Sequence, residues 1–169
     1  MKLKLWNQVF ASTFLVIFSI KEALAVQFEA TGKAVAAVLG TTKAKKKTVN
    51  VDGKDVTVFY STDDSGKASK LAFVQEGLYK PNCTHTWIVG VDAKTTSITG
   101  IRVVEMACPH AFPTKESSFL DQFTGKGPKD VAELSSDIHG VAKATGTSNL
   151  TVDAVKSSIK GAMSLKGQI

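Results

Sequence analysis

The sequence predicts an α+β domain in which helices flank an antiparallel β-sheet. Two patterns lead to this fold class. Several β-prone segments separated by short turns occupy the middle of the chain, and the strongest helical periodicity lies near the C-terminus. Strands joined by short turns pair antiparallel, and helices outside such a run of strands pack on the finished sheet. We therefore expect one sheet with a C-terminal amphipathic helix against it.

The N-terminus has the three parts of a secretion signal. Two lysines give a positive start, an apolar run extends from Val9 to Ile20, and Ala23-Leu24-Ala25 supplies the small residues that a signal peptidase requires. The apolar run is shorter than the roughly 20 residues of a membrane-spanning helix. We therefore expect residues 1–25 to be a cleaved signal peptide. Residues 26–169 would then be one periplasmic or secreted domain without a stable membrane span.

A helix and a hairpin open the expected mature domain. The alanine-rich segment Ala30–Leu39 favours a short helix that ends at Gly40. Two β-prone runs follow, Thr48–Val51 and Lys54–Tyr60, and Asp52-Gly53 joins them. Because Asp-Gly tolerates the positive φ angles of a tight hairpin turn, we expect the two runs to pair.

Three more strands are expected after the hairpin. Leu71–Gln75 follows a polar turn, and Ile98–Met106 is rich in β-branched residues. Between them, Thr84–Val91 alternates between two faces. One of its faces carries His85, Trp87, Val89 and Val91.

Two helices are expected after the strands. A loop over Pro109–Glu116 leads into a short helix over Ser117–Phe123, and a longer helix is predicted over Asn149–Met163. The apolar residues of the longer helix recur at spacings of three and four, at Val152, Val155, Ile159 and Ala162. This spacing predicts a helix that packs on one side.

The two cysteines favour a disulfide, because both lie in the exported part of the chain. If Trp87 faces Val104 across the last strand pair, Cys83 lies opposite Cys108. Their α-carbons would then be about 4.5 to 5.5 Å apart, which a disulfide accepts. Two alternatives remain open. The cysteines could be free thiols, or a zinc or copper ion could bind the two Cys-x-His units, Cys83-Thr84-His85 and Cys108-Pro109-His110.

The charge of the chain is mildly basic. The net charge is +6, and it falls to +4 once the three lysines and one glutamate of the expected signal are removed. Four lysines between residues 43 and 47 form a basic run, which is typical of a solvated loop and could also dock an anionic partner or membrane surface. No aromatic residues interleave with this run, so we expect no nucleic-acid binding.

Hydroxyl residues precede the last predicted helix. The segment is Ala144-Thr145-Gly146-Thr147-Ser148. A helix N-terminus presents unpaired N–H groups and a partial positive charge, so hydroxyls and a glycine at this position suit a phosphate. Serine and threonine are also preferred as N-cap residues. The residues themselves therefore allow either a helix cap or a phosphate site.

Three stretches resemble the FMN-binding domain family, which includes flavin-carrying subunits of ion-pumping respiratory complexes and related periplasmic proteins. Residues 89–92 with 98–103 resemble the family's "vGvd…ItgirV" hairpin, and residues 118–126 resemble "sFldqFkGk". Residues 144–148 followed by 152–155 resemble "SGATxTS…vdAV". The three stretches keep the family's order, and the likeness covers about residues 70–163. It implies the α+β fold expected above.

The resemblance implies an FMN site at the start of the last helix. In many family members a threonine of the last motif carries FMN through a phosphoester bond, and by position that residue is Thr145. Thr147 and Ser148 would contact the phosphate. The cofactor-binding residues implied in this way are Lys143, Thr145, Gly146, Thr147 and Ser148.

The sequence departs from the family pattern around this motif. Ala142-Lys143 stands where the family has Ser/Thr-Gly, His139 replaces the usual aspartate, and residues 108–113 replace a glycine-rich loop that approaches the flavin ring. These departures argue against covalent attachment at Thr145. Two possibilities stay open: non-covalent FMN with Lys143 offsetting the phosphate charge, and a domain that has lost its flavin.

The function implied by the resemblance is electron transfer. We expect an exported flavoprotein that binds FMN and passes electrons to a redox partner protein in an extracytoplasmic chain. A carrier is favoured over an enzyme, because no Ser-His-Asp order, P-loop or paired carboxylates rise above chance. The alternative is a flavin-free binding module that uses a disulfide or a metal site at Cys83, His85, Cys108 and His110.

Overall fold

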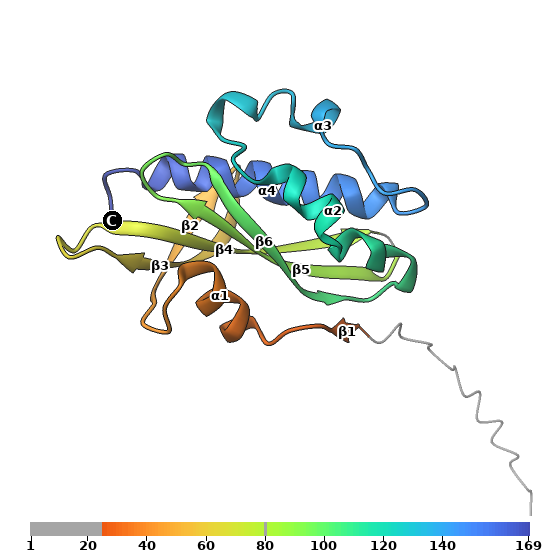
Figure 1. Ribbon diagram of the computed structural model, residues 1–169, viewed down its shortest axis with the longest axis horizontal. Coiled ribbons are helices and arrows are strands. Elements are labelled where there is room, and N and C mark those ends of the chain that lie inside the picture. The colour runs from red at the N-terminus through yellow and green to blue at the C-terminus, as the bar shows by residue number, and fades with distance from the viewer. Residues whose placement is uncertain (1–24, 80) are drawn as a thin grey trace, which may run out of the picture.

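The protein folds around one six-stranded antiparallel sheet (Figure 1). The computed structural model describes residues 25–79 and 81–169. Across the sheet the strand order is β1-β6-β5-β4-β3-β2. In chain order the strands are β1 (Val26–Gln27), β2 (Lys45–Val51), β3 (Lys54–Thr62), β4 (Ala68–Tyr79), β5 (Cys83–Asp92) and β6 (Ile98–Met106).

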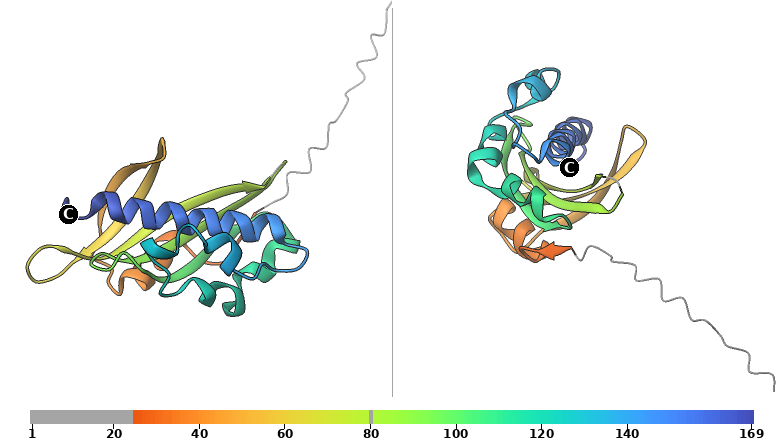
Figure 2. Two further views of the ribbon diagram at one scale, coloured as in Figure 1. Left: turned by 90° about the horizontal axis from the view of Figure 1, so that it is seen from above. Right: turned by 90° about the vertical axis from the view of Figure 1, so that its right-hand side faces the viewer.

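Two helices cover opposite faces of the sheet. The sheet curves around α4 (Thr145–Leu165), while α1 (Thr31–Leu39) packs on the other face (Figure 2). Trp87 and Phe73 belong to the large core under α4, whereas Leu39 and Ile88 belong to a smaller cluster under α1. The predicted α+β class, with an amphipathic C-terminal helix against an antiparallel sheet, is confirmed. The alternation of Thr84–Val91 is confirmed as well, because Trp87, Val89 and Val91 belong to the core under α4 while Ile88 belongs to the cluster under α1.

The chain between β6 and α4 covers one edge of the core. It forms the 3₁₀ helices η1 (Pro109–Lys115), η2 (Asp121–Phe123) and η3 (Pro128–Asp130), and the short helices α2 (Ser117–Leu120) and α3 (Leu134–Asp137). The buried rings of Phe119 and Phe123 pack edge to face, with their centroids 5.4 Å apart. The predicted loop over Pro109–Glu116 is therefore mostly 3₁₀ helix. The predicted helix over Ser117–Phe123 is divided between α2 and η2.

Three of the four lysines of the basic run lie in a strand, so the expectation of a solvated loop is wrong for them and holds only for Lys43. Lys45, Lys46 and Lys47 begin β2, which lies at the edge of the sheet. The ammonium groups of Lys45 and Lys46 lie 6.0 and 5.9 Å from the ring centroids of Tyr60 and Phe59. Lysines on an edge strand also discourage pairing with a second protein's strand. These three lysines are therefore part of the sheet's edge.

The start of α4 also differs from the prediction. The helix begins at Thr145, before the predicted start at Asn149. Hydroxyl and glycine residues are poor helix formers, so the sequence pattern placed the boundary too late. In the structure the hydroxyl of Ser148 donates to the Ala144 carbonyl, and that of Thr151 donates to the Thr147 carbonyl. These bonds keep the hydroxyls compatible with the first two turns.

The register of β5 and β6 differs from the predicted one because of a β-bulge. His85 pairs with Met106, but the register shifts between Thr86 and Trp87, so that Trp87 lies opposite Val103. The predicted pairing of Trp87 with Val104 is therefore wrong by one residue. The predicted disulfide is nevertheless present, because the pairing before the bulge brings the cysteines together, with the α-carbons of Cys83 and Cys108 5.4 Å apart.

The predicted signal peptide lies outside the described residues, apart from Ala25. Cleavage after residue 25 therefore stays a prediction. Within residues 25–79 and 81–169, no helix has both the length and the apolar character needed to cross a membrane.

Candidate functional site

A pocket of about 310 Å³ lies at the N-terminus of α4. Its lining comes from three parts of the chain: the end of β4, the helix η1 and the segment that enters α4. The lining residues are Tyr79, His110, Lys143, Ala144, Thr145, Gly146 and Thr147. Four of the five residues implied as cofactor-binding are thus brought together around one pocket.

The entry to α4 is fixed by a hydrogen-bonded turn. Lys143 adopts a left-handed backbone conformation with φ 65°. The hydroxyl of Ser148 accepts the N–H of Val141 at 3.0 Å and donates to the Ala144 carbonyl at 3.1 Å. Ser148 is therefore buried beneath the turn and is absent from the pocket lining. Its side chain holds the loop that presents Lys143 and Thr145.

The electrostatics of the pocket favour an anion. The side chains of Lys143 and Thr145 are exposed, and the first N–H groups of α4 are free of partners within the helix. A helix N-terminus carries a partial positive charge, which Lys143 reinforces. No acidic side chain occurs among the described residues that line this pocket. The donor set therefore suits a phosphate or another anion.

Gly146 is required by close packing with Tyr79. A β-carbon placed on Gly146 would overlap the Tyr79 ring. Tyr79 is itself about half exposed, and it lies opposite Cys83 across the β4–β5 pair. Its ring therefore forms one wall of the pocket and leaves another part open to solvent. The sequence pattern missed this residue, since the predicted third strand ended at Gln75.

A buried histidine lies beneath the pocket floor. The His85 side chain is 1 % exposed, and its Nε2 lies 3.3 Å from the Thr147 hydroxyl. Its Nδ1 has no hydrogen-bond partner among the described residues. Burial, and then the electrostatic effect of nearby His110, lower the pKa of His85. The imidazole is therefore kept neutral, and it positions Thr147.

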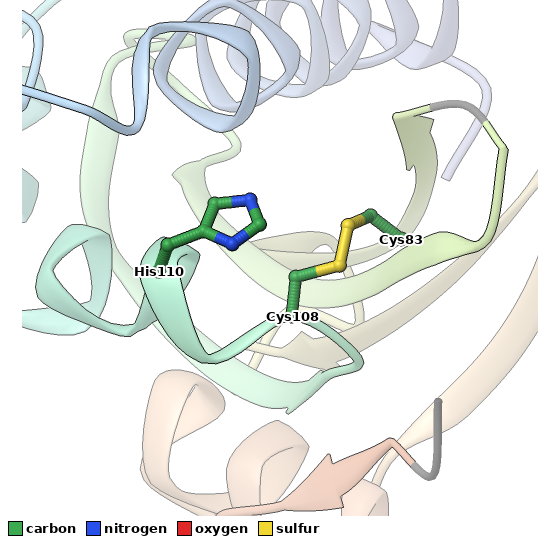
Figure 3. Close-up of side chains that lie close together, drawn as sticks. All are labelled: Cys83, Cys108 and His110. Carbon is green, nitrogen blue, oxygen red and sulfur yellow. A yellow bond between two sulfur atoms is a disulfide. The ribbon is translucent and has the colours of Figure 1, made fainter. Parts of the chain in front are cut away.

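The disulfide borders the same pocket. Figure 3 shows the imidazole of His110 beside the Cys83–Cys108 bond, and the ligand atoms of these three residues lie within 4.8 Å of one another. His85 is outside this group and bonds to Thr147 instead. The structure thus assembles three of the four residues of the metal alternative. Metal ions bind cysteine as thiolate, and the disulfide removes both thiolates.

The comparisons with known proteins return nothing. No protein-family model matches the sequence, no curated protein matches it, and no solved structure matches the fold.

Proposed function

We propose that the protein binds FMN non-covalently at the N-terminus of α4 and carries electrons outside the cytoplasm. The observation that supports this most directly is the pocket that Lys143, Thr145, Gly146 and Thr147 line together. These are residues that the resemblance to FMN-binding domains implies, and the same residues form a site whose donors suit a phosphate.

The chain's own groups would bind the phosphate end of the cofactor. The N–H groups at the start of α4 donate to phosphate oxygens, the Thr145 hydroxyl adds a donor, and Lys143 offsets the charge. A pocket of about 310 Å³ is near the lower end of the roughly 300–1,000 Å³ usual for ligand sites. It would therefore enclose the phosphate and the chain next to it and leave the flavin ring more open.

Electron transfer follows from what the flavin supplies when bound, which is reversible uptake of one or two electrons. Tyr79 offers an aromatic surface beside the anion site, and its exposed part leaves a path for a partner protein. The disulfide supports placing this function outside the cytoplasm, where disulfides persist. A separate redox protein would be the electron donor or acceptor.

The alternative is a flavin-free binding module whose functional element is the cysteine pair. The Cys83–Cys108 disulfide and nearby His110 favour it. This alternative predicts no affinity for FMN. The two proposals therefore give opposite results in a flavin titration.

The test is a titration of FMN with the purified mature chain, in which the quenching of flavin fluorescence reports binding. We expect saturable binding that inorganic phosphate weakens. Lys143→Ala should weaken binding about tenfold, because loss of one charge-assisted contact with phosphate costs about 1.5 kcal/mol. The matched control is Lys94→Ala, which removes an exposed lysine from the β5–β6 turn.

Thr145→Ala distinguishes the modes of attachment. If FMN is non-covalent, this variant should still bind it, with a loss of a few-fold. Flavin that stays with the acid-precipitated wild-type protein and is absent from Thr145→Ala would instead mean covalent attachment. Absence of binding by the wild-type chain would refute the FMN proposal.

A further inference from the structure

The Cys83–Cys108 disulfide is buried, but its sequence neighbours are exposed. Cys83 is 7 % exposed and Cys108 is 8 % exposed, and both belong to the main core. Asn82 and Thr84, on either side of Cys83, are exposed, as is His110. The buried pair is therefore flanked by exposed residues, which a second molecule could contact first.

The surroundings of the disulfide would stabilise a thiolate. His110 places a ring nitrogen within 4.8 Å of both sulfur atoms (Figure 3). His110 and Tyr79, the β-sheet neighbour of Cys83, also line the pocket that holds Lys143 and the positive end of α4. Cationic groups and helix N-termini favour the charged form of cysteine and so favour reduction of a disulfide.

The two cysteines would stay together after reduction. Next to the disulfide, the Ala107 N–H donates to the Thr84 carbonyl at 2.9 Å, and His85 pairs with Met106. These contacts belong to the sheet and do not depend on the sulfur–sulfur bond. The dithiol would therefore keep the geometry needed to form the disulfide again.

Exposed apolar side chains gather at this end of the sheet. The exposed large hydrophobic residues of the described chain are Val26, Phe28, Leu78, Tyr79 and Met163. Leu78 and Tyr79 pair with Thr84 and Cys83, and Val26 pairs with Met106. The Phe28 ring packs on Phe112 of η1, with the centroids 5.1 Å apart. Leu78 and Tyr79 thus lie beside the disulfide, and exposed apolar residues of this kind are typical of a contact surface for another protein.

We propose that Cys83 and Cys108 form a redox-active disulfide that exchanges with the dithiol of a partner protein, with His110 stabilising the thiolate that is released. A partner thiolate attacks one sulfur, the Cys83–Cys108 bond breaks, and a mixed disulfide and one cysteine thiolate result. The partner's second thiolate then displaces the other cysteine. The partner leaves with a disulfide, and Cys83 and Cys108 are left as thiols after proton uptake. This exchange does not rest on FMN.

The test uses the mature chain and glutathione as the probe. The protein is equilibrated without oxygen in buffers of different ratios of reduced to oxidised glutathione. The reaction is then quenched with acid, free thiols are alkylated, and mass spectrometry gives the fraction of dithiol. We expect substantial conversion to the dithiol within the accessible ratios. His110→Ala should move the equilibrium about tenfold toward the disulfide, as a change of about one unit in a thiol pKa would. His139→Ala, at an exposed histidine in another loop, is the matched control and should stay within about twofold.

A second measurement separates the thiolate effect from a structural one. The rate at which iodoacetamide alkylates the reduced protein is followed against pH, with circular dichroism confirming that each variant is folded. His110→Ala should move the midpoint of this profile to higher pH, and His139→Ala should not. The proposal is overturned if glutathione leaves the disulfide intact at every ratio. It is equally overturned if the His110 and His139 variants behave alike.

Discussion

The two ends of the β5–β6 hairpin satisfy their polar groups in opposite ways. At the turn, the Asp92 carboxylate accepts the N–H groups of Lys94 and Thr95 and the hydroxyl of Thr95. At the other end, beside the disulfide, His85 Nδ1 and Trp87 Nε1 are buried without a partner among the described residues. The turn is held by three hydrogen bonds to one carboxylate, while the other end contains two unsatisfied buried groups.

This difference distinguishes the turn end, which stabilises the fold, from the disulfide end, where we propose that the functional sites lie. Buried polar groups without partners are costly and rare, and each one calls for an explanation. Here both lie under the segment that carries the disulfide, the α4 N-terminus and the pocket. Departures from good local structure tend to gather at functional sites. The contrast therefore supports placing function at the disulfide end.

Reduction of the disulfide is the largest expected change. Chain entropy alone predicts a loss of about 3.5 kcal/mol for a sequence separation of 25 residues. If His110 stabilises the reduced form, the folded protein should lose less than this, since whatever favours the folded dithiol reduces the cost of breaking the bond. Urea unfolding of the oxidised and reduced protein measures the difference.

The same measurement on His110→Ala sharpens the comparison. Without the imidazole, the difference in unfolding free energy between the oxidised and reduced protein should grow toward the value expected from chain entropy alone. A loss of about 3.5 kcal/mol or more in the wild-type chain, unchanged by His110→Ala, would identify the disulfide as purely structural.

Removal of the Asp92 side chain should have a moderate effect. Three hydrogen bonds, above all the one from the Thr95 N–H, keep the pKa of Asp92 below its ordinary value. Asp92→Ala leaves these donors to water and should cost about 1–2 kcal/mol of unfolding free energy. Asp92→Asn keeps an acceptor and should cost less. The control is Asp64→Ala, at an exposed position of the β3–β4 turn. Equal losses at Asp92 and Asp64 would contradict this account of the turn.

Much of the fold could be predicted because local pattern and tertiary structure agree. The alternation of Thr84–Val91 identified the face that holds Trp87, and the helical spacing identified Val155 and Ile159 as buried under the sheet. The disulfide could also be predicted. The proposed register holds at its end of the hairpin, and the bulge that shifts it begins only after Thr86.

The pocket could be predicted only in part, because half of it depends on contacts between distant residues. Lys143 and Thr145 belong to a recognisable segment, whereas Tyr79 lies beyond Glu76-Gly77, which breaks the β-prone pattern. Gly77 is nonetheless required in β4, since a β-carbon there would come within 2.8 Å of the Trp87 ring. No local pattern contains that contact. The lysines of β2 were misassigned for a similar reason, because only the sheet places them on an edge strand.

The smallest expected effect is a pH dependence of stability from His85. Burial, and then His110, lower its pKa below the ordinary value of 6.5 in the folded protein. Between the two pKa values the unfolded chain binds more protons, so the unfolding free energy should fall as the pH drops below about 6.5. The pKa of Asp92 is also lowered, but its effect on stability is lost only as the pH falls below about 3.8, the ordinary value of an aspartate. Thermal melts between pH 7.5 and 5 therefore report mainly on His85. His85→Gln should flatten the profile in this range and His139→Gln should preserve it, whereas an unchanged slope in His85→Gln would mean that another group titrates.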